Sequence, residues 1–330
     1  MAEAGFNHNG KLELAKKLLK KGKECNVSAV KFQTFKSEKL VSRKAKVYGV
    51  RDAKLPKYQV DLYKPFELSK SDYAALFHLA RQLKFEIFST PFDQESADLL
   101  DSFHVPVFKI ASGDVTHHPL LKHVAKKKKP IMMSCGMATF DEIGEALDVI
   151  YRTGNRKVVL LHCVSNYPAK HEDMNLNRML AIKRKFGTRV GLSDHTNDLY
   201  ASFAAAALGA CVIERHFTLD RNMKGVDHYF SLDPSLMFDL VKGIRTIEKT
   251  IGKSYSGILP VERKIANLAR RSLLSCRNIR KGEIIRSDMI EVKRPGSGIR
   301  PKYLNRVLGM KAKTNIPAEE LLQWNRLIRK

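Results

Sequence analysis

Short runs of apolar, often β-branched residues alternate with longer amphipathic segments along most of the chain. The short runs predict buried strands, and apolar residues at helical spacing predict helices. The strand-like runs cover residues 28–34, 85–90, 105–111, 130–134, 157–163, 188–193 and 210–217. The helical patterns cover residues 11–23, 71–84, 94–103, 140–152, 175–186, 199–208 and 235–251. Repeated strand–helix units predict an α/β fold in which helices cover a parallel sheet.

Residues 2–5 look like the end of a further, first strand, which would bring the number of strands to eight. Eight strand–helix units predict a closed (β/α)8 TIM barrel. The segment after the second strand, residues 42–68, has little periodicity. Loops of this length in compact domains are usually functional or disordered, and we expect the same of this one.

The last part of the chain has a different pattern. Residues 252–270 begin with Gly, Ser and Pro and predict a linker. Residues 271–330 contain short apolar runs and turns, and they carry 15 Lys and Arg against 5 Asp and Glu. We therefore expect a barrel over residues 1–251, a linker, and a small, mostly-β, basic domain over residues 271–330.

Composition and charge narrow the possible functions. The chain has 330 residues, a formal net charge of +25 and five dispersed cysteines without a C-x-x-C pair. Such dispersed cysteines are typical of reduced thiols, and neither a secretory signal nor a long apolar run is visible, so we expect a cytoplasmic protein without membrane contact. No nucleic-acid-binding motif accompanies the basic charge, which favours a small anionic substrate over a nucleic acid.

Two histidines suggest a metal site. His195 and His216 each end a strand-like run, and one helical segment lies between them. Strands connected in this way are parallel neighbours, so both imidazoles should emerge at the same end of the barrel. Paired imidazoles are suitable ligands for a divalent metal. On spacing alone, two structural histidines at strand ends remain an equal alternative.

Polar side chains end almost every predicted strand, and a barrel gathers strand ends around one mouth. Hydroxyls and two lysines at such a mouth are typical of a phosphate or carboxylate site. These residues are Lys31, Gln33, Ser89, Thr90, Lys109, Ser112, Asp114, Ser134, His162, Ser165, Ser193, His195 and His216.

The motifs around these residues resemble those of the sialic acid synthase family, in order and over almost the whole chain. They are Ala2-Glu-Ala-Gly-x-Asn-His-Asn-Gly10, Lys31-Phe-Gln-Thr-Phe, Ser89-Thr-Pro-Phe-Asp93, Phe108-Lys-Ile-Ala-Ser-Gly-Asp114, Ser134-Cys-Gly-Met137, Leu161-His-Cys-Val-Ser-x-Tyr-Pro168, Gly191-Leu-Ser-Asp-His-Thr196, Glu214-Arg-His-Phe-Thr218, Gly225-Val-Asp-His228 and Lys293-Arg-Pro-Gly296.

The resemblance implies a transferase that condenses phosphoenolpyruvate with N-acetylmannosamine and water to give N-acetylneuraminate and phosphate, with cleavage of a C–O bond. The alternative within the family is legionaminate or pseudaminate synthesis from a 2,4-diacetamido hexose. An alternative of another class is a non-catalytic polyanion-binding protein. The family also implies a TIM barrel followed by an antifreeze-like SAF domain, which here would be residues 271–330.

The resemblance further implies roles for individual residues. Glu3 would be catalytic, and His195 and His216 would bind manganese or magnesium, or else cobalt. Asp114, Asp227 and Arg294 would contact the sugar, with Arg294 reaching the barrel of the partner in a domain-swapped homodimer. Leu268 stands where some members have an aromatic residue near the acyl group. Phosphoenolpyruvate would be bound by Lys31, Thr90, Lys109, Ser112, Ser134, Ser165 and Ser193.

Overall fold

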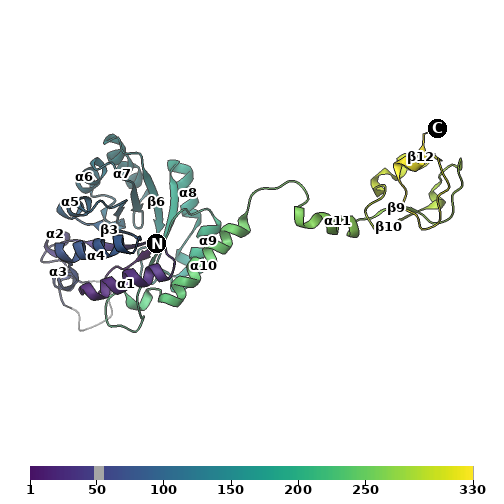
Figure 1. Ribbon diagram of the computed structural model, residues 1–330. Helices are drawn as coiled ribbons and strands as arrows, with labels where there is room; N and C mark the ends of the chain where they lie inside the picture. Colours follow the sequence, from purple (N-terminus) through teal and green to yellow (C-terminus); the bar gives the residue numbers. More distant parts are fainter. Residues whose placement is uncertain (48–55, 330) are drawn as a thin grey trace. The chain divides into compact units, whose positions relative to one another are not determined.

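The structure, a computed structural model, describes residues 1–47 and 56–329, which form two compact units, residues 1–252 and 253–330. In the first unit, eight parallel strands close into a barrel in sequence order, and the predicted TIM-barrel fold is confirmed (Figure 1). The short β1 pairs with both β2 and β8 and so closes the barrel. The strands are β1 (Ala2–Glu3), β2 (Ala29–Thr34), β3 (Glu86–Pro91), β4 (Phe108–Ile110), β5 (Ile131–Ser134), β6 (Val158–Cys163), β7 (Arg189–Asp194) and β8 (Ile213–His216).

Helices surround the barrel and bury their apolar faces against it (Figure 1). Two begin with reciprocal capping boxes, Ser69 with Asp72 and Thr139 with Glu142, which satisfy free N–H groups of the first turn. They are α1 (Leu12–Glu24), α2 (Ser37–Leu40), α3 (Gln59–Tyr63), α4 (Lys70–Gln82), α5 (Gln94–Ser102), α6 (His118–Lys126), α7 (Phe140–Arg152), α8 (Asn177–Phe186), α9 (Tyr200–Ala207) and α10 (Pro234–Ile251). Short 3-10 turns, η1 to η4, occupy Lys64–Phe66, Ser112–Asp114, His171–Asp173 and His228–Phe230.

The segment predicted as a long loop is partly helical. It contains α3 and η1, while residues 48–55 lie outside the described part. Tertiary contacts hold it: the Phe6 ring lies 5.5 Å from that of Tyr63 and 4.9 Å from that of Phe66. Glu67 accepts hydrogen bonds from the backbone N–H and hydroxyl of Ser37, at 2.8 and 2.6 Å. Because these contacts come from distant residues, hydrophobic periodicity did not indicate the helices.

The second unit has its own core, formed around Leu273, Ile279 and Met289. The segment predicted as a linker includes η5 (Pro260–Glu262) and α11 (Arg263–Ala269). The remaining elements are β9 (Ser272–Ser275), η6 (Ser287–Met289), β10 (Ile290–Lys293), η7 (Pro301–Tyr303), α12 (Leu304–Val307), β11 (Lys311–Ala312), η8 (Trp324–Arg326) and β12 (Leu327–Ile328). The strands pair antiparallel, β9 with β10 and β11 with β12, which gives the expected small β domain. None of the described helices has the length and apolar character needed to cross a membrane.

Candidate active site

The carboxyl ends of the barrel strands surround a cavity of about 590 Å³. Eleven of the thirteen residues to which the family resemblance assigns roles line it, and each strand, or the segment directly after it, contributes at least one of them. They are Glu3, Lys31, Thr90, Lys109, Ser112, Ser134, Ser165, Ser193, His195, His216 and Asp227. The barrel therefore gathers lysines, carboxylates, hydroxyls and imidazoles that lie far apart in the sequence.

Strand alternation explains which side chains face the cavity. In the parallel register, Ser193 lies beside Glu214 and Asp194 beside Arg215. Ser193 Oγ donates to Glu214 Oε1 at 2.9 Å inside the barrel. Asp194 and Arg215 point to the other face, where their side chains pair at 2.6 Å. Because successive side chains of a strand alternate, Glu214 and His216 point into the same cavity.

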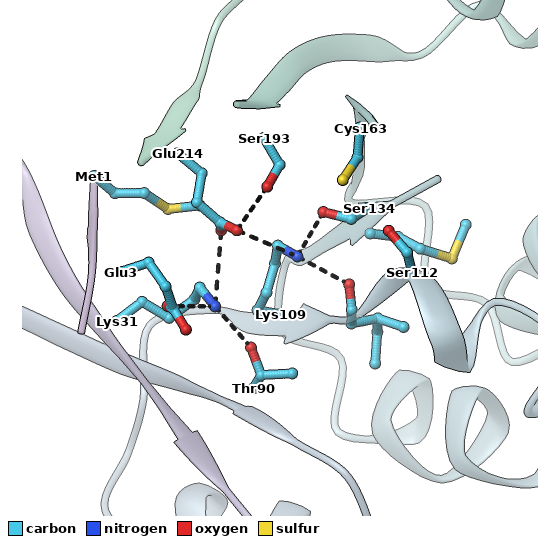
Figure 2. Close-up of polar contacts among 12 residues, drawn as sticks. Met1, Glu3, Lys31, Thr90, Lys109, Ser112, Ser134, Cys163, Ser193 and Glu214 are labelled. Atoms are coloured by element: carbon cyan, nitrogen blue, oxygen red, sulfur yellow. Dashed lines mark hydrogen bonds and ion pairs between the residues drawn. The ribbon is translucent and has the colours of Figure 1, made fainter. Parts of the chain in front are cut away.

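Two lysines and two glutamates form a buried ionic cluster at this cavity (Figure 2). Lys31 Nζ lies 2.5 Å from Glu3 Oε2 and 3.8 Å from Glu214 Oε2. Lys109 Nζ lies 3.9 Å from Glu214 Oε1. Each of the four side chains is at most 5% exposed. Glu214 thus lies between two buried ammonium groups, and its negative charge stabilises their positive charges.

The cluster shifts the acidity of its members. Burial would raise the pKa of Glu214, but Lys109 and Lys31 outweigh it and lower the pKa to about 2. Burial would lower the pKa of Lys31, but Glu214 and Glu3 raise it above its ordinary value. For Lys109, burial outweighs the attraction of Glu214, and the pKa is lowered. At neutral pH Glu214 is therefore an anion and Lys31 a cation.

Hydroxyl groups surround the two ammonium groups. Lys31 Nζ donates to Thr90 Oγ1 at 3.0 Å, and Lys109 Nζ donates to Ser134 Oγ at 2.7 Å. The backbone N–H of Gly136 donates to Ser112 Oγ at 3.0 Å. A Cβ at Gly136 would lie 2.4 Å from Ser165 Oγ, so a larger residue would displace a hydroxyl of the site. Such a concentration of donors fits a phosphate or carboxylate.

The two predicted metal ligands lie beside this cluster, with ring centroids 5.4 Å apart. His195 Nδ1 lies 2.8 Å from the carbonyl oxygen of Val164; donation to that oxygen leaves Nε2 with its lone pair. His216 Nδ1 is buried without a hydrogen-bond partner among the described residues, and Asp227 Oδ2 lies 3.4 Å away. These two imidazoles suit a divalent ion. The described residues contain no cluster of three or more His, Cys, Asp or Glu placed to hold a metal.

Four predicted residues, Ser89, Asp114, His162 and Arg294, do not line the cavity. Ser89 Oγ pairs with Thr34 Oγ1 at 2.7 Å, and His162 Nε2 lies 2.6 Å from the Met174 carbonyl oxygen, so these two predictions are wrong. Asp114 lies on the 3-10 turn η2, two residues after Ser112, and at three residues per turn the two side chains diverge. Burial raises the pKa of Asp114 to about 6, although Lys109 acts against it. Arg294 belongs to the second unit, where it is exposed directly after β10.

Sequence reasoning missed other residues of the site. Glu214 was not assigned a role, although its position two residues before His216 in a strand was sufficient to predict that both face the cavity. Gln33 was predicted at the barrel mouth but was given no individual role; its Nε2 donates to Glu3 Oε1 at 2.8 Å and so orients this carboxylate. The Tyr167 ring lies 4.1 Å from that of His195, a contact that no sequence spacing indicates.

Comparisons with known proteins agree with this architecture. Residues 18–256 match the model of the NeuB family, and residues 270–328 match that of the SAF domain. The chain is 41% identical to N,N'-diacetyllegionaminic acid synthase of Campylobacter jejuni, over 98% of each chain. It is 31% identical to human N-acetylneuraminate-9-phosphate synthase, over 98% of this chain and 90% of the human protein.

A solved structure of a related enzyme has a similar fold. The N-acetylneuraminic acid synthetase of Leptospira borgpetersenii, crystallised with citrate, superposes with a TM-score of 0.72 at 31% identity. The superposition covers 80% of this chain and 88% of that protein. With its barrel, its second small domain and these matches, the chain belongs to the NeuB family of sialic, legionaminic and pseudaminic acid synthases.

Proposed function

We propose that the protein condenses phosphoenolpyruvate with an N-acylated hexosamine and water to give a nonulosonic acid and phosphate. The observation that carries this proposal is the single cavity in which a lysine and hydroxyl cradle lies beside two imidazoles. The cradle matches the phosphate and carboxylate of phosphoenolpyruvate, and the imidazoles lie where the second substrate must meet it.

We assign roles in this reaction to residues of the ionic cluster. Lys31 and Lys109 bind the two anionic groups of phosphoenolpyruvate and hold its C3 toward the aldehyde carbon of the sugar. The electrons of the C2=C3 double bond form the new C–C bond, while the aldehyde C=O double bond opens and its oxygen gains a proton. Positive charge develops at C2, and water adds to C2 and loses its protons as the C2 ketone forms. The C2–O bond then breaks, and its electrons leave with the phosphate.

The two carboxylates differ in what they can do. With a pKa of about 2, Glu214 is too weak a base to take a proton near neutral pH, and it serves to keep the lysines charged. Glu3, oriented by Gln33, stabilises the charge at C2 or orients the incoming water. A divalent ion held by His195 and His216, manganese or magnesium by its preference for imidazole and oxygen, would polarise the aldehyde oxygen of the sugar.

The proposal has two candidate acceptor sugars. N-acetylmannosamine is the acceptor predicted from the sequence, and the likeness to the Leptospira borgpetersenii synthetase supports it. A 2,4-diacetamido hexose is supported by the higher identities, 41% and 40%, to the legionaminic acid synthases of Campylobacter jejuni and Legionella pneumophila. We further propose that the protein acts in the cytoplasm, a reducing compartment that suits its five free cysteines.

The proposal is tested by phosphate release from phosphoenolpyruvate in the presence of each sugar and manganese. Phosphoenolpyruvate labelled with heavy oxygen at the bridging position separates the two modes of cleavage. Cleavage of the C–O bond transfers the label to phosphate, whereas cleavage of the P–O bond leaves it in the sugar acid. Binding of polyanions without phosphate release from any sugar would favour the non-catalytic alternative.

A further inference from the structure

We propose that an apolar wall at the cavity mouth, formed by Phe6, Leu40, Val41, Leu62 and Phe92, binds a second acyl group of the acceptor sugar. The wall would make the protein select a 2,4-diacetamido hexose over a hexosamine with one acyl group. This inference rests on the proposed function, because it concerns the second substrate of the same cavity.

The wall is built by segments that follow the first three strands. Leu40 ends α2, Val41 follows it, and Leu62 lies on α3, which packs beside α2 (Figure 1). Phe6 follows β1, and Phe92 follows β3. All five line the cavity, and Leu40 and Val41 are half-buried, so they keep apolar surface open to a ligand.

Aromatic packing fixes the wall in place. The Phe35 ring lies 6.1 Å from that of Phe92 and 5.9 Å from that of Phe6. The Phe6 ring stacks on Tyr63 at 5.5 Å, one residue after Leu62. A preformed apolar surface of this kind favours a ligand methyl group, because binding requires little ordering of the protein.

A second apolar patch lies across the barrel. Tyr167 follows β6, Phe230 follows β8, and Tyr229 donates from its hydroxyl to the Tyr167 carbonyl at 2.8 Å. In a closed barrel of eight strands in sequence order, β2 and β6 stand opposite each other. The ionic cluster and the two histidines line the same cavity as these two apolar surfaces.

Each apolar surface also carries one carboxamide. Gln59 lines the cavity with the wall, and Asn166 lines it with Tyr167. An acetamido group presents a methyl and a polar amide together, so each surface matches one such group. A sugar with one acyl group would leave one surface facing a hydroxyl, which gains nothing from apolar contact. Two matching surfaces around one polar centre therefore indicate an acceptor with two acyl groups.

The test compares two identical substitutions in the same region. Val41 and Val60 are both half-buried, but only Val41 lines the cavity. We expect the parent to favour the 2,4-diacetamido hexose over N-acetylmannosamine in kcat/KM by about tenfold or more, the discrimination typical of a small apolar group. Leu40→Asn should remove most of this preference and Val41→Thr part of it, while Val60→Thr should keep it. The KM for phosphoenolpyruvate should stay unchanged in all three variants.

Titration calorimetry with each sugar separates this inference from the proposed function. Tighter binding of the diacetamido hexose that Leu40→Asn weakens supports the wall even if no phosphate is released, in which case the proposed function fails. Phosphate release with a sugar preference that Leu40→Asn and Val41→Thr leave unchanged overturns the wall and retains the function. The Leu40→Asn variant could instead change the oligomeric state in solution while the preference between the two sugars stays unchanged. That result would also overturn the proposed role of the wall, since the wall would then be a subunit contact.

Discussion

Lys109 contacts Ser134, Glu214 and the backbone around β4, and in the proposed complex it touches phosphoenolpyruvate but not the sugar. Lys109→Met keeps the length of the side chain and removes its charge. Since a charge-assisted hydrogen bond contributes about 1.5–3 kcal/mol, we expect the KM for phosphoenolpyruvate to rise about 10- to 100-fold. The KM for the sugar should change by less than about threefold. Steady-state kinetics with each substrate varied measure both effects, and equal losses for both would indicate a folding defect.

Substitutions of His195 and His216 should affect metal binding as well as turnover. His195→Ala or His216→Ala should abolish turnover and weaken manganese binding, because each removes one of two protein ligands. Manganese titration by calorimetry measures binding independently of activity, and a chelator should inactivate the parent. His123, which pairs with Asp98 at 2.7 Å on the outside of the barrel, is the matched control: His123→Ala should retain both properties. Full activity of the chelated parent would exclude the metal role.

Asp114 gives a pH-dependent prediction for stability. Burial raises its pKa from 3.8 to about 6, so ionisation costs more in the folded than in the unfolded protein. This group destabilises the fold increasingly as pH rises from about 4 to 6, and by a constant amount above that. Asp114→Asn should therefore increase the free energy of unfolding by up to about 3 kcal/mol at pH 8 and by only about 0.5 kcal/mol at pH 4. Urea denaturation at both pH values tests this, and an increase of equal size at both would contradict the role of ionisation.

At the scale of elements, local patterns were sufficient for the barrel but not for every helix. The strands alternate with amphipathic segments whose periodicity is local, so their order and the closed sheet could be predicted. The helix α6 was not predicted, because it begins and ends among His, Pro and Lys residues. The helices α2, α3 and α11 have only four, five and seven residues, too few for a periodic pattern. Of these, α3 follows Tyr58, which provides no side-chain cap, and its segment is held by aromatic contacts with residues far away in sequence.

The same distinction applies to the site. A barrel rule places strand ends around one mouth, and ten of the thirteen polar strand-end residues selected in this way do line the cavity. The ion pairs of Glu214 with Lys31 and Lys109 join three strands, and neither their distances nor their effect on pKa follows from spacing. The direction of Asp114 depends on a 3-10 turn after β4 that no sequence pattern indicated.

The junction of β7, β8 and α9 contains a buried ion pair beside the strand ends that carry His195 and His216. Arg215, which is 1% exposed, donates to Asp194 Oδ2 at 2.6 Å and to the Thr196 carbonyl at 2.5 Å. Ser202 on α9 donates to the same carboxylate oxygen at 2.5 Å. Arg215→Met would leave the Asp194 carboxylate buried without its partner, and we expect a loss of about 3–5 kcal/mol in the free energy of unfolding.

Two further variants check this expectation by denaturant titration. Adding Asp194→Asn to Arg215→Met should recover part of the loss, because the unpaired charge is removed. Arg245→Met is the exposed control: Arg245 pairs with Glu248 at 2.9 Å with more than half of each side chain exposed, so the loss should stay below about 1 kcal/mol. A loss for Arg215→Met no larger than that of Arg245→Met would contradict the importance of the buried pair.

For the whole molecule, the distribution of charge suggests why the second unit is basic. Residues 271–330 carry 15 basic and 5 acidic side chains, and the proposed reaction uses an anionic substrate in the first unit. A basic domain near an anion-binding site would favour entry of that substrate. The family resemblance implies that the domain serves the barrel of a partner subunit through Arg294, in a dimer with twofold symmetry. In such a dimer the twofold axis makes the two contacts between a SAF domain and the barrel of the other subunit identical.

This arrangement predicts complementation between two inactive proteins. Arg294→Ala and His216→Ala chains are mixed, dissociated and re-associated, and phosphate release is compared with that of the parent. In a swapped heterodimer, the barrel of the Arg294→Ala chain receives the intact Arg294 of the His216→Ala chain, so one site of the two is complete. We expect each heterodimer to recover about half of the parent activity.

The controls of this experiment distinguish a SAF domain that serves the partner's barrel from one that serves its own. Each variant alone, taken through the same treatment, should remain inactive, and parent protein should regain its activity. If each SAF domain served the barrel of its own chain, every active site in the mixture would carry one lesion and no activity would return. If the parent control regains activity and the mixture does not, the exchange of SAF domains between subunits is excluded. Mixing Lys109→Met with His216→Ala provides a further control: both lesions lie in barrels, so no heterodimer contains an intact site and no activity should return.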